Sequence, residues 1–480
     1  MGLGSWPARR ARMSPERTAM VYSGQSTTYA ELAARVTRLA WQLRKAGVDP
    51  GDRVAYLGPN HPAFVETMFA THVLGGVFVP LNFRLTESEV DHMLTGSGAK
   101  LLVSDREFSC PTIPLDDYED WVAAGSPEPI DEPVALDDLA LILYTSGTTG
   151  RPKGAMLSHA NLLWNTVNLL AGVDVASDEV ALVSAPLFHV AALTQTLLPT
   201  VLKGGTAVLT ASWYVETCFD LIAEHRITWM FGVTTMYAAL AHSPRWATAD
   251  LTSLRRLLCG GAAVPESLIR EYQDRGLVFC QGYGLTETAP GATFLEAADS
   301  VRKAGSAGVP VFFGDIRIIR ADGGEAAPGE PGEVLVQGPN VTPGYWHDPQ
   351  ATASALADGW FHTGDVAKLD DEGHLYIVDR LKDMFISGGE NVYPAEVEKA
   401  AAGHPSVEEV AVVGVPDEKW GEVGRAFVRC RPGATLTRDE LRSYLLGRLA
   451  KYKIPVHVDV VDQLPRTGSG KVLKSALRHR

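Results

Sequence analysis

A polar, glycine-rich stretch, Tyr144-Thr-Ser-Gly-Thr-Thr-Gly-Arg-Pro-Lys-Gly154, combines the residue types that hold phosphate. Glycines let the backbone approach an anion closely, hydroxyls donate hydrogen bonds to it, and a lysine supplies positive charge. The residues concerned are Gly147, Gly150, Gly154, Thr145, Ser146, Thr148, Thr149 and Lys153. An apolar, strand-like run at 139–143 precedes the loop, and Ser158 and Asn161 lead into an apolar-periodic helix. Strand, polar loop and helix is a common phosphate-binding order, so the stretch predicts a nucleotide loop.

The loop is not a P-loop of the G-x-x-x-x-G-K-[ST] type, because Gly154 and not a metal-binding hydroxyl follows Lys153. The alternative interpretation is a flexible linker. Linkers seldom lie between a buried strand and a helix, so we expect a phosphate loop of another kind.

Composition restricts the possible partners. The 480 residues suggest two to four domains, and the net charge of -14 argues against nucleic acid or an anionic membrane as the main partner. No apolar run approaches the length of a transmembrane helix, and Arg9, Arg10 and Arg12 precede no apolar signal segment. The five cysteines form no C-x-x-C pair, so we expect buried free thiols and a cytoplasmic protein.

The first half of the chain alternates between strand and helix patterns. Thr28 with Glu31, and Thr86 with Glu89, are capping-box pairs that begin two helices. Apolar runs predict strands at 53–57, 76–80 and 99–103 and a helix at 64–74. This alternation predicts parallel sheets with helices on their faces. Residues 104–136 are rich in Pro and Asp and are expected to form a surface connection.

The pattern continues after the loop and then changes twice. Strands are expected at 180–184, 206–209, 228–231, 256–259 and 278–281, and a helix at 264–274. From about Gly305, alternation at 309–319, 332–336 and 374–378 predicts a smaller β-rich subdomain. Residues 380–480 predict a compact α+β unit with helices at 392–401 and 439–449 and strands at 407–415 and 425–431. The fold class is therefore α/β, with a small α+β domain at the C-terminus.

Four further motifs accompany the glycine loop along the chain. They are Pro186-Leu-Phe-His-Val190; Gln281-Gly-Tyr-Gly-Leu-Thr-Glu-Thr288; Gly359-Trp-Phe-His-Thr-Gly-Asp365 with Asp379-Arg-Leu-Lys-Asp383 and Ser387-Gly-Gly-Glu-Asn391; and Gly468-Ser-Gly-Lys471. Together the five stretches resemble the adenylate-forming acyl/aryl-CoA ligases, relatives of firefly luciferase and of stand-alone adenylation domains. The resemblance covers nearly the whole chain. It implies an AMP-binding adenylation domain at 1–379 and a mobile domain with a catalytic lysine at 380–480.

The resemblance also implies a reaction in two halves. A small-molecule carboxylic acid attacks the α-phosphate of ATP to give acyl-AMP and pyrophosphate, and coenzyme A then takes the acyl group. ATP, coenzyme A and Mg²⁺ are the expected cofactors, and the oligomeric state is not predicted.

Residue by residue, the resemblance assigns the nucleotide site. The glycine loop would hold the β- and γ-phosphates. Tyr283, beside Gly261, Ala262 and Gly284, would stack on adenine; Thr286 and Glu287 would meet the α-phosphate and Mg²⁺, as hydroxyl and carboxylate oxygens should. Asp365 and Arg380 would hold the ribose, and Lys471 would bridge the carboxylate and the α-phosphate. The alternatives are a core tyrosine at 283, a solvated turn at Glu287 or Asp365, and an ordinary basic tail at Lys471.

The thioester half-reaction is assigned in the same way. Lys382 matches the family's hinge, about which the C-terminal domain rotates, and Gly388 and Gly389 would line the pantetheine tunnel. Trp420 and Tyr452 match positions that touch coenzyme A, although both could equally be core aromatics. The chain has Ile454 where relatives often carry a basic residue.

The acid would be bound by small or apolar residues. They are His189, which is also assigned to catalysis, Val190, Phe231, Gly260, Gly282, Gly284 and Pro290. No Arg or Lys lies among them to pair with a second carboxylate, so diacids are disfavoured. A flat aromatic ring or an extended alkyl chain fits such a pocket.

Two finer resemblances compete for the acid. The opening residues 2–15, Tyr56-Leu-Gly-Pro-Asn-His-Pro62 and Val79-Pro-Leu-Asn-Phe-Arg84 resemble actinobacterial feruloyl-CoA synthetases. Phe188-His-Val-Ala-Ala-Leu-Thr194 and Arg302-Lys-Ala-Gly-Ser-Ala-Gly308 also resemble bacterial fatty acyl-CoA synthetases. The first set is longer and less generic, so the preferred acid is ferulate or another hydroxycinnamate. A stand-alone adenylation enzyme that loads a carrier protein is a further alternative.

Overall fold

The computed structural model describes residues 2–145, 152–261, 264–387, 390–466 and 471–478. Two compact units divide the chain. The larger unit contains Met1–Ile316, Leu335–His362 and Gly373–Leu375; the smaller unit contains Arg317–Val334, Thr363–Glu372 and Tyr376–Arg480. The α/β class predicted from the sequence is confirmed, while the domain boundary between residues 379 and 380 stays a prediction.

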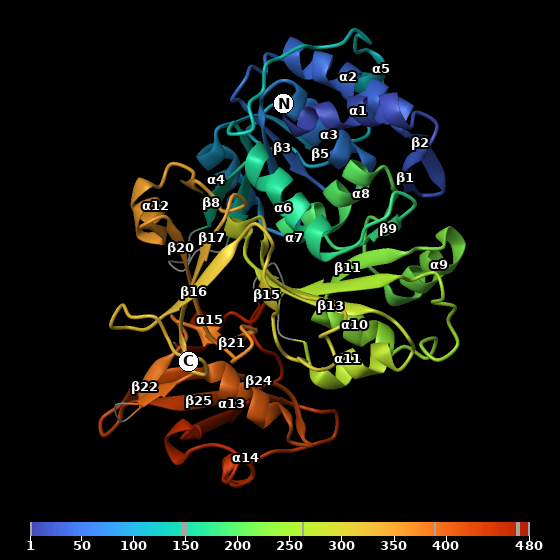
Figure 1. The fold of residues 1–480 in the computed structure, drawn as a ribbon. Coiled ribbons are helices and arrows are strands. Elements are labelled where there is room, and N and C mark those ends of the chain that lie inside the picture. The colour runs from blue at the N-terminus through green and yellow to red at the C-terminus, as the bar shows by residue number, and fades with distance from the viewer. Residues whose placement is uncertain (1, 146–151, 262–263, 388–389, 467–470, 479–480) are drawn as a thin grey trace. The chain divides into compact units, whose positions relative to one another are not determined.

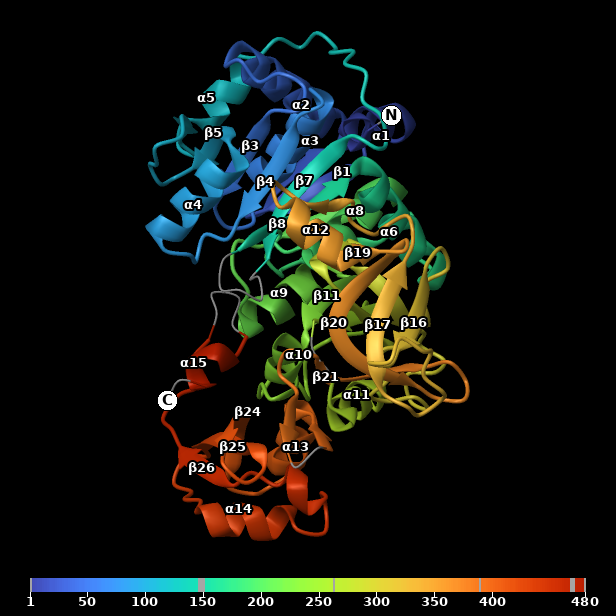
Figure 2. The same ribbon diagram turned by 90° about the vertical axis from the view of Figure 1, so that its left-hand side faces the viewer.

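A seven-stranded sheet in the larger unit carries the glycine loop. Its order is β18 (Gly344–Tyr345), β8 (Lys153–Ser158), β7 (Leu139–Thr145), β4 (Val77–Leu81), β3 (Arg53–Leu57), β5 (Ala99–Ser104) and β6 (Thr112–Ile113). Strands β7, β4, β3, β5 and β6 are parallel, and β8 and β18 are antiparallel to their neighbours. Helix α2 (Tyr29–Lys45) packs against α3 (Pro62–Val73) and α5 (Tyr118–Ala123) in this part of the unit (Figure 1, Figure 2).

A nine-stranded sheet forms the rest of the larger unit's framework. Its order is β15 (Val309–Pro310), β14 (Gly291–Leu295), β13 (Phe279–Gly284), β12 (Arg256–Gly260), β11 (Trp229–Val233), β9 (Val180–Val183), β10 (Thr206–Leu209), β1 (Thr18–Tyr22) and β2 (Gln25–Thr28). The six central strands from β13 to β1 are parallel. The predicted parallel strands are thus confirmed in both large sheets.

Two further sheets contain five strands each. The third sheet has the order β16 (Asp315–Ile319), β17 (Gly332–Gln337), β20 (Trp360–Leu369) and β19 (Leu356–Ala357), with β21 (Leu375–Arg380) beside β20. In Figure 2, β16, β17 and β20 run side by side. The fourth has the order β23 (Glu390–Val392), β22 (Phe385–Ser387), β25 (Gly421–Cys430) and β24 (Val407–Asp417), with β26 (His457–Val460) beside β25.

Twelve more α-helices complete the elements that the structure describes. They are α1 (Trp6–Met13), α4 (Glu87–Ser97), α6 (His159–Gly172), α7 (Val190–Ala192), α8 (Leu198–Lys203), α9 (Val215–His225), α10 (Thr234–Ala241), α11 (Glu266–Gln273), α12 (Pro349–Ala355), α13 (Pro394–Ala402), α14 (Arg438–Leu445) and α15 (Lys474–Arg478). Short turns are η1 (Leu3–Ser5), the π-helical η2 (Leu193–Leu197), η3 (Thr286–Thr288) and η4 (Lys451–Lys453).

Local capping chemistry explains why the predicted helices begin where they do. The Thr28 hydroxyl accepts a hydrogen bond from the Glu31 backbone N–H, and the Glu31 carboxylate accepts from the Thr28 N–H at 2.7 Å. The same reciprocal box forms at Thr86 with Glu89. Each box satisfies N–H groups that the first helical turn leaves unpaired.

Two expectations about local structure were wrong. The connection at 104–136 contains β6 and α5, and Tyr118 and Val122 of α5 are buried. A strand, β8, also lies between the glycine loop and helix α6, so a strand and not a helix follows the loop. The apolar contacts of α5 and the antiparallel pairing of β8 are tertiary, and no local sequence pattern announces them.

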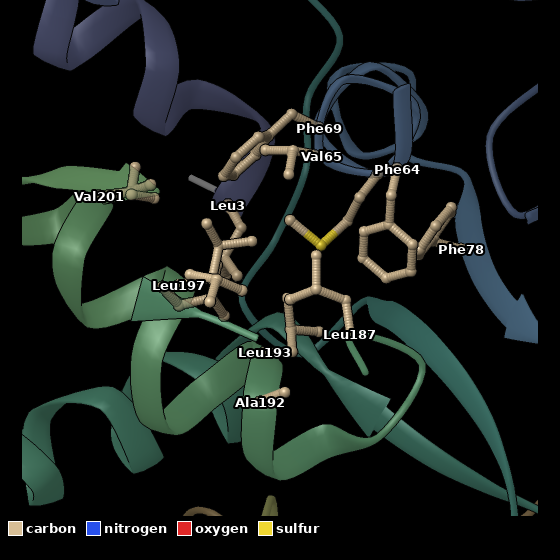
Figure 3. Close-up of a cluster of buried hydrophobic side chains, with 14 of the residues drawn as sticks. Leu3, Phe64, Val65, Phe69, Phe78, Leu187, Ala192, Leu193, Leu197 and Val201 are labelled. Carbon is tan, nitrogen blue, oxygen red and sulfur yellow. The ribbon is translucent and has the colours of Figure 1, made fainter. Parts of the chain in front are cut away.

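The larger unit's core continues into the N-terminal segment. Figure 3 shows Leu3 pointing into a space bordered by Val65 and Phe69 of α3 and by Leu197 and Val201. Gly4 makes this approach possible, because a Cβ there would lie 2.4 Å from the Val73 nitrogen.

The expected burial of free thiols is confirmed. All five cysteines are free; four are buried and Cys430 is partly exposed. In the described part of the chain, no helix combines the length and apolar composition needed to cross a membrane.

A pair of buried histidines makes stability depend on pH. The Leu3 backbone N–H donates to His159 Nδ1 at 3.2 Å, and the rings of His159 and His72 lie 4.8 Å apart. Burial lowers the pKa of His159 to about 4 and lowers the pKa of His72 as well. The folded protein therefore holds both imidazoles neutral.

We predict that the protein loses stability as the pH falls from about 6.5 towards 4. Unfolded histidine binds a proton below pH ~6.5 while folded His159 does not, and the difference in pKa is worth at most about 3 kcal/mol. Melting temperatures of the wild type and of His159→Gln between pH 7.5 and 4.5 check this. The variant should show a shallower decline, and identical declines would contradict the assignment.

Candidate functional site

The ends of the glycine loop lie together in an antiparallel hairpin. Strand β7 ends at Thr145 and β8 begins at Lys153, and these two residues are paired across the strands. The Thr145 hydroxyl donates to the Lys153 carbonyl at 3.4 Å. Ser146, Gly147, Thr148, Thr149 and Gly150 lie outside the described residues. The hairpin thus holds the two ends of the loop, Thr145 and Lys153, side by side.

Glycine 154 has a packing role in this hairpin. It is buried in β8 opposite Tyr144, and a Cβ there would lie 2.7 Å from Ile142 Cγ2 and 3.4 Å from Trp346 Cβ. Its lack of a side chain lets β8 lie against β7 and the segment after β18.

A buried carboxylate and the loop lysine meet at one tyrosine. Glu287 is 8% exposed, and its Oε1 accepts a hydrogen bond from the Tyr345 hydroxyl at 2.9 Å. The ammonium nitrogen of Lys153 lies over the Tyr345 ring, 5.4 Å from its centroid. The structure therefore brings together two of the predicted phosphate and metal residues through a third residue that the sequence did not single out.

The motif around Tyr283 is clamped at its end. Tyr283 and Gly284 end β13, and Thr286 and Glu287 lie in η3. A Cβ at Gly284 would lie 1.5 Å from the Pro290 carbonyl oxygen, so only glycine fits at this position. The turn thus returns directly against β13.

Asparagines of helix α6 and of the segment before β18 hold this turn. Asn165 Oδ1 accepts from the Gly291 N–H at 2.9 Å, and Asn340 Nδ2 donates to the carbonyls of Thr288 and Gly291, both at 2.6 Å. Asn161 Nδ2 donates in turn to Pro339 and Val341, both at 2.8 Å. These amides fix the backbone that directly follows Glu287 and the segment before β18.

Three residues predicted to bind the acid come together at the ends of neighbouring parallel strands. They are Phe231 of β11, Gly260 of β12 and Gly282 of β13. A Cβ on Gly260 would lie 3.3 Å from the Gly282 oxygen and 3.5 Å from Phe231 Cε2. The absence of a side chain at Gly260 thus leaves bare backbone beside the Phe231 ring. Gly261 follows in a left-handed conformation at φ +86°, and Ala262 lies outside the described residues.

His189 is held by two N-terminal segments. It is exposed at the start of α7, whereas Val190 is buried. The buried amide of Asn60 donates to Val183 and Ala185 and accepts from the Leu187 N–H at 2.8 Å. The Phe83 ring contacts Phe188 edge-on at 5.7 Å. Asn60 and Phe83 therefore position the segment that ends in His189.

In the smaller unit, the predicted ribose residues form an ion pair. Asp365 is 2% exposed, and its Oδ1 lies 2.5 Å from Arg380 Nε. Loss of hydration lowers the pKa of Lys471; Arg380 and Lys382 lower it further, and Asp365 opposes them. The structure thus brings Lys471, Asp365, Arg380 and the predicted hinge Lys382 into one electrostatic cluster.

The predicted coenzyme A residues are placed only in part. Trp420 and Tyr452 are 49% and 40% exposed, so neither is a core aromatic. Gly388 and Gly389 lie outside the described residues. Lysine ammonium groups lie over both rings, Lys419 over Trp420 and Lys453 over Tyr452. The roles of Trp420 and Tyr452 in binding coenzyme A stay predictions.

The donor set around Glu287 fits Mg²⁺ bound together with a nucleotide. In the described part of the chain, no group of three or more His, Cys, Asp or Glu side chains is placed to hold a metal. Mg²⁺ commonly takes one or two carboxylates and completes its shell with phosphate oxygens and water. A single buried carboxylate, Glu287, close to the lysine of the phosphate loop is consistent with this coordination of Mg²⁺.

Family comparisons agree with this arrangement. Residues 7–346 match the AMP-binding enzyme family, and residues 396–471 match the AMP-binding enzyme C-terminal domain.

The chain belongs to the AMP-binding enzymes. The resemblance to adenylate-forming acyl/aryl-CoA ligases is thereby confirmed, and this AMP-binding enzyme is an acid–thiol ligase.

Relatives and solved structures match along the full length. The chain is 56% identical to a feruloyl-CoA synthase from an Amycolatopsis species, over all of this chain and 99% of the relative. It is 38% identical to a long-chain-fatty-acid–CoA ligase from Mycobacterium tuberculosis, over 99% and 98%. Its fold matches O-succinylbenzoate coenzyme A synthetase from Bacillus subtilis in complex with ATP and magnesium ion, with a TM-score of 0.91, 36% identity and coverage of 98% and 99%.

We predict that Gly284→Ala removes activity, because the added Cβ overlaps the Pro290 carbonyl and must displace the turn that carries Glu287. Gly96→Ala is the matched control. Gly96 lies in helix α4, where its Cβ would meet only the Tyr144 hydroxyl at 3.3 Å and alanine favours the helix by about 1 kcal/mol. Acid-dependent AMP formation should fall at least about 100-fold in Gly284→Ala, which corresponds to about 3 kcal/mol. It should change less than about twofold in Gly96→Ala; equal activity of the two variants would contradict the clamp.

Proposed function

We propose that this AMP-binding enzyme activates ferulate and related hydroxycinnamates and transfers them to coenzyme A. The observation that carries the proposal is the 56% identity to a feruloyl-CoA synthase over the full length of both chains. The long-chain-fatty-acid–CoA ligase matches over a similar length at 38% identity. The enzyme uses ATP, coenzyme A and Mg²⁺.

Contacts between two N-terminal segments and the residues before His189 support the proposal. Two of the segments that resemble feruloyl-CoA synthetases contain Asn60 and Phe83. Both residues contact the segment that leads to His189, through hydrogen bonds and through the Phe188 ring. The segments that resemble feruloyl-CoA synthetases therefore include residues that position His189, which is assigned to the acyl site.

The residues proposed for the acid suit a flat ring. Phe231 lies beside the bare backbone of Gly260, and such a surface can stack on an aromatic ring. No Arg or Lys belongs to the set, so a second carboxylate would be buried without a partner. These features support an aromatic monoacid.

In the first half-reaction, a carboxylate oxygen of the acid bonds to the α-phosphorus of ATP, and the bond to the bridging oxygen of pyrophosphate breaks. Lys153 and the loop hydroxyls hold the departing phosphates, Tyr283 stacks on adenine, and Asp365 and Arg380 hold the ribose. Lys471 stabilises the charge that develops between the carboxylate and the phosphate. Glu287 would hold Mg²⁺, and the cation would supply positive charge beside the phosphate oxygens.

In the second half-reaction, the thiolate of coenzyme A bonds to the acyl carbon and AMP leaves with the electron pair of the broken C–O bond. Trp420 and Tyr452 would contact coenzyme A, and the family resemblance assigns Gly388 and Gly389 to the pantetheine tunnel. His189 would lie next to the acyl group. Lys382 would be the hinge about which the C-terminal domain rotates between the two half-reactions.

A medium- or long-chain fatty acid is the second candidate substrate. The motif that begins at Phe188 and the match to the Mycobacterium tuberculosis ligase favour it. A carrier-protein acceptor is a third possibility and differs from both, because such an enzyme would not need free coenzyme A.

We predict that purified enzyme with Mg-ATP and coenzyme A forms AMP fastest with ferulate or 4-coumarate. Cinnamate, octanoate and palmitate are the comparison acids, and reactions without coenzyme A are the control. We expect kcat/KM for the phenolic acids to exceed that for the fatty acids at least tenfold, a margin that the fit of a substrate in an apolar pocket commonly supplies. Faster turnover of octanoate or palmitate would contradict the hydroxycinnamate proposal. If acyl-AMP formed equally with and without coenzyme A and no thioester appeared, a carrier-protein acceptor would be indicated.

A further inference from the structure

Tyr345 joins the phosphate loop to the carboxylate proposed to bind Mg²⁺. Its hydroxyl donates to Glu287 Oε1 at 2.9 Å, and the face of its ring receives the Lys153 ammonium at 5.4 Å.

The backbone around Tyr345 is fixed on both sides. The Trp346 N–H donates to the Gly154 carbonyl at 2.8 Å, and the Tyr345 N–H donates to the Thr352 hydroxyl at 2.9 Å. The Thr342 N–H donates to the Glu287 carbonyl at 2.7 Å, while its hydroxyl donates to the Met156 carbonyl at 2.6 Å. The segment therefore spans strand β8 and η3 and cannot move without disturbing both.

The direction of this hydrogen bond follows from the chemistry of the two groups. An ionised carboxylate has only acceptor oxygens, so the Tyr345 hydroxyl donates and Glu287 Oε1 accepts.

We propose that Tyr345 is a positioning residue for Mg²⁺–ATP. Its hydroxyl fixes the rotation of the Glu287 carboxylate through Oε1 and so presents Oε2 to the cation. Its ring holds the Lys153 ammonium beside the phosphates that the same cation binds. This inference rests on the proposed function of Glu287 and Lys153.

The two contacts have separable effects. Deleting the hydroxyl removes a hydrogen bond to a charged group, a loss that corresponds to about a 10- to 100-fold effect. Deleting the ring removes a cation–π contact, for which about a 3- to 30-fold effect is ordinary. Tyr345→Phe deletes only the first, and Tyr345→Leu deletes both.

The test measures binding by calorimetry, titrating each variant with ATP in excess Mg²⁺ and with ATP in EDTA. Tyr345→Phe should weaken binding of Mg-ATP about tenfold or more and leave binding of metal-free ATP within about twofold of the wild type. Tyr345→Leu should weaken both. Tyr29→Phe is the matched control, because it deletes a buried hydroxyl that donates to the Gly205 carbonyl at 2.6 Å in another part of the same unit.

A double-mutant cycle decides whether Tyr345 acts through Glu287. In a Glu287→Gln background, the further change Tyr345→Phe should alter Mg-ATP binding less than about twofold, because the carboxylate that Tyr345 positions for the cation is already gone. Melting temperatures are recorded for every variant to separate binding from folding.

The inference is overturned if Tyr345→Phe lowers the melting temperature but leaves the Mg²⁺ dependence of ATP binding unchanged, or if the effects of the two substitutions are additive. It is also overturned if Glu287→Gln binds Mg-ATP like the wild type. Because the assay contains no acid, a failure of the ferulate proposal would change the preferred acid without changing any of these results.

Discussion

Burying the carboxylate of Glu287 is the constraint on which the arrangement of the site depends. A buried charge is costly unless donors hold it. The donor here is the phenol of Tyr345, 58 residues along the chain. To bring the two together, the protein must return the segment after β17 to the edge of the glycine-loop sheet, where β18 pairs with β8. The same pairing places the Lys153 ammonium over the phenol ring, so a single tertiary contact sets the geometry of the lysine and the carboxylate.

Helix α6 holds the backbone segments around this contact through hydrogen bonds. Asn161, Asn165 and Asn168 follow helical spacing, and their side chains bond the backbone at 339–341, Gly291 and Phe313. Asparagine is a poor residue for a helix interior, and three of them on one face indicate a role other than helix formation. Through these hydrogen bonds the helix holds the backbone at Gly291, Phe313 and 339–341 in place.

Much of the fold could be predicted because its signals are local. Capping boxes at Thr28 and Thr86 fixed where helices begin, and apolar runs identified β3, β10 and their parallel neighbours. Strand β8 was missed because it pairs antiparallel to β7 through contacts that the local pattern does not contain. The ten-residue strand β20, which carries Asp365, was recognised as a motif and not as a strand.

The same distinction applies to the site. Glycines, hydroxyls, Glu287 and Asp365 stand in motifs whose composition indicates nucleotide chemistry. Tyr345 stands in no such motif, and no spacing within the sequence relates it to Glu287. The asparagine spacing in α6 was visible, but only the structure shows which backbone groups the amides bind.

We propose that the enzyme works through an acyl-adenylate whose formation needs Lys471 and whose consumption does not. The most direct measurement compares the wild type and Lys471→Ala in the two half-reactions separately. Ferulate-dependent exchange of labelled pyrophosphate into ATP reports the first, and thioester formation from supplied feruloyl-AMP and coenzyme A reports the second. The account predicts that Lys471→Ala loses exchange by about 100-fold or more, as expected for an electrostatic group in a transition state, and keeps thioester formation near the wild-type rate. Equal loss of both half-reactions would contradict it.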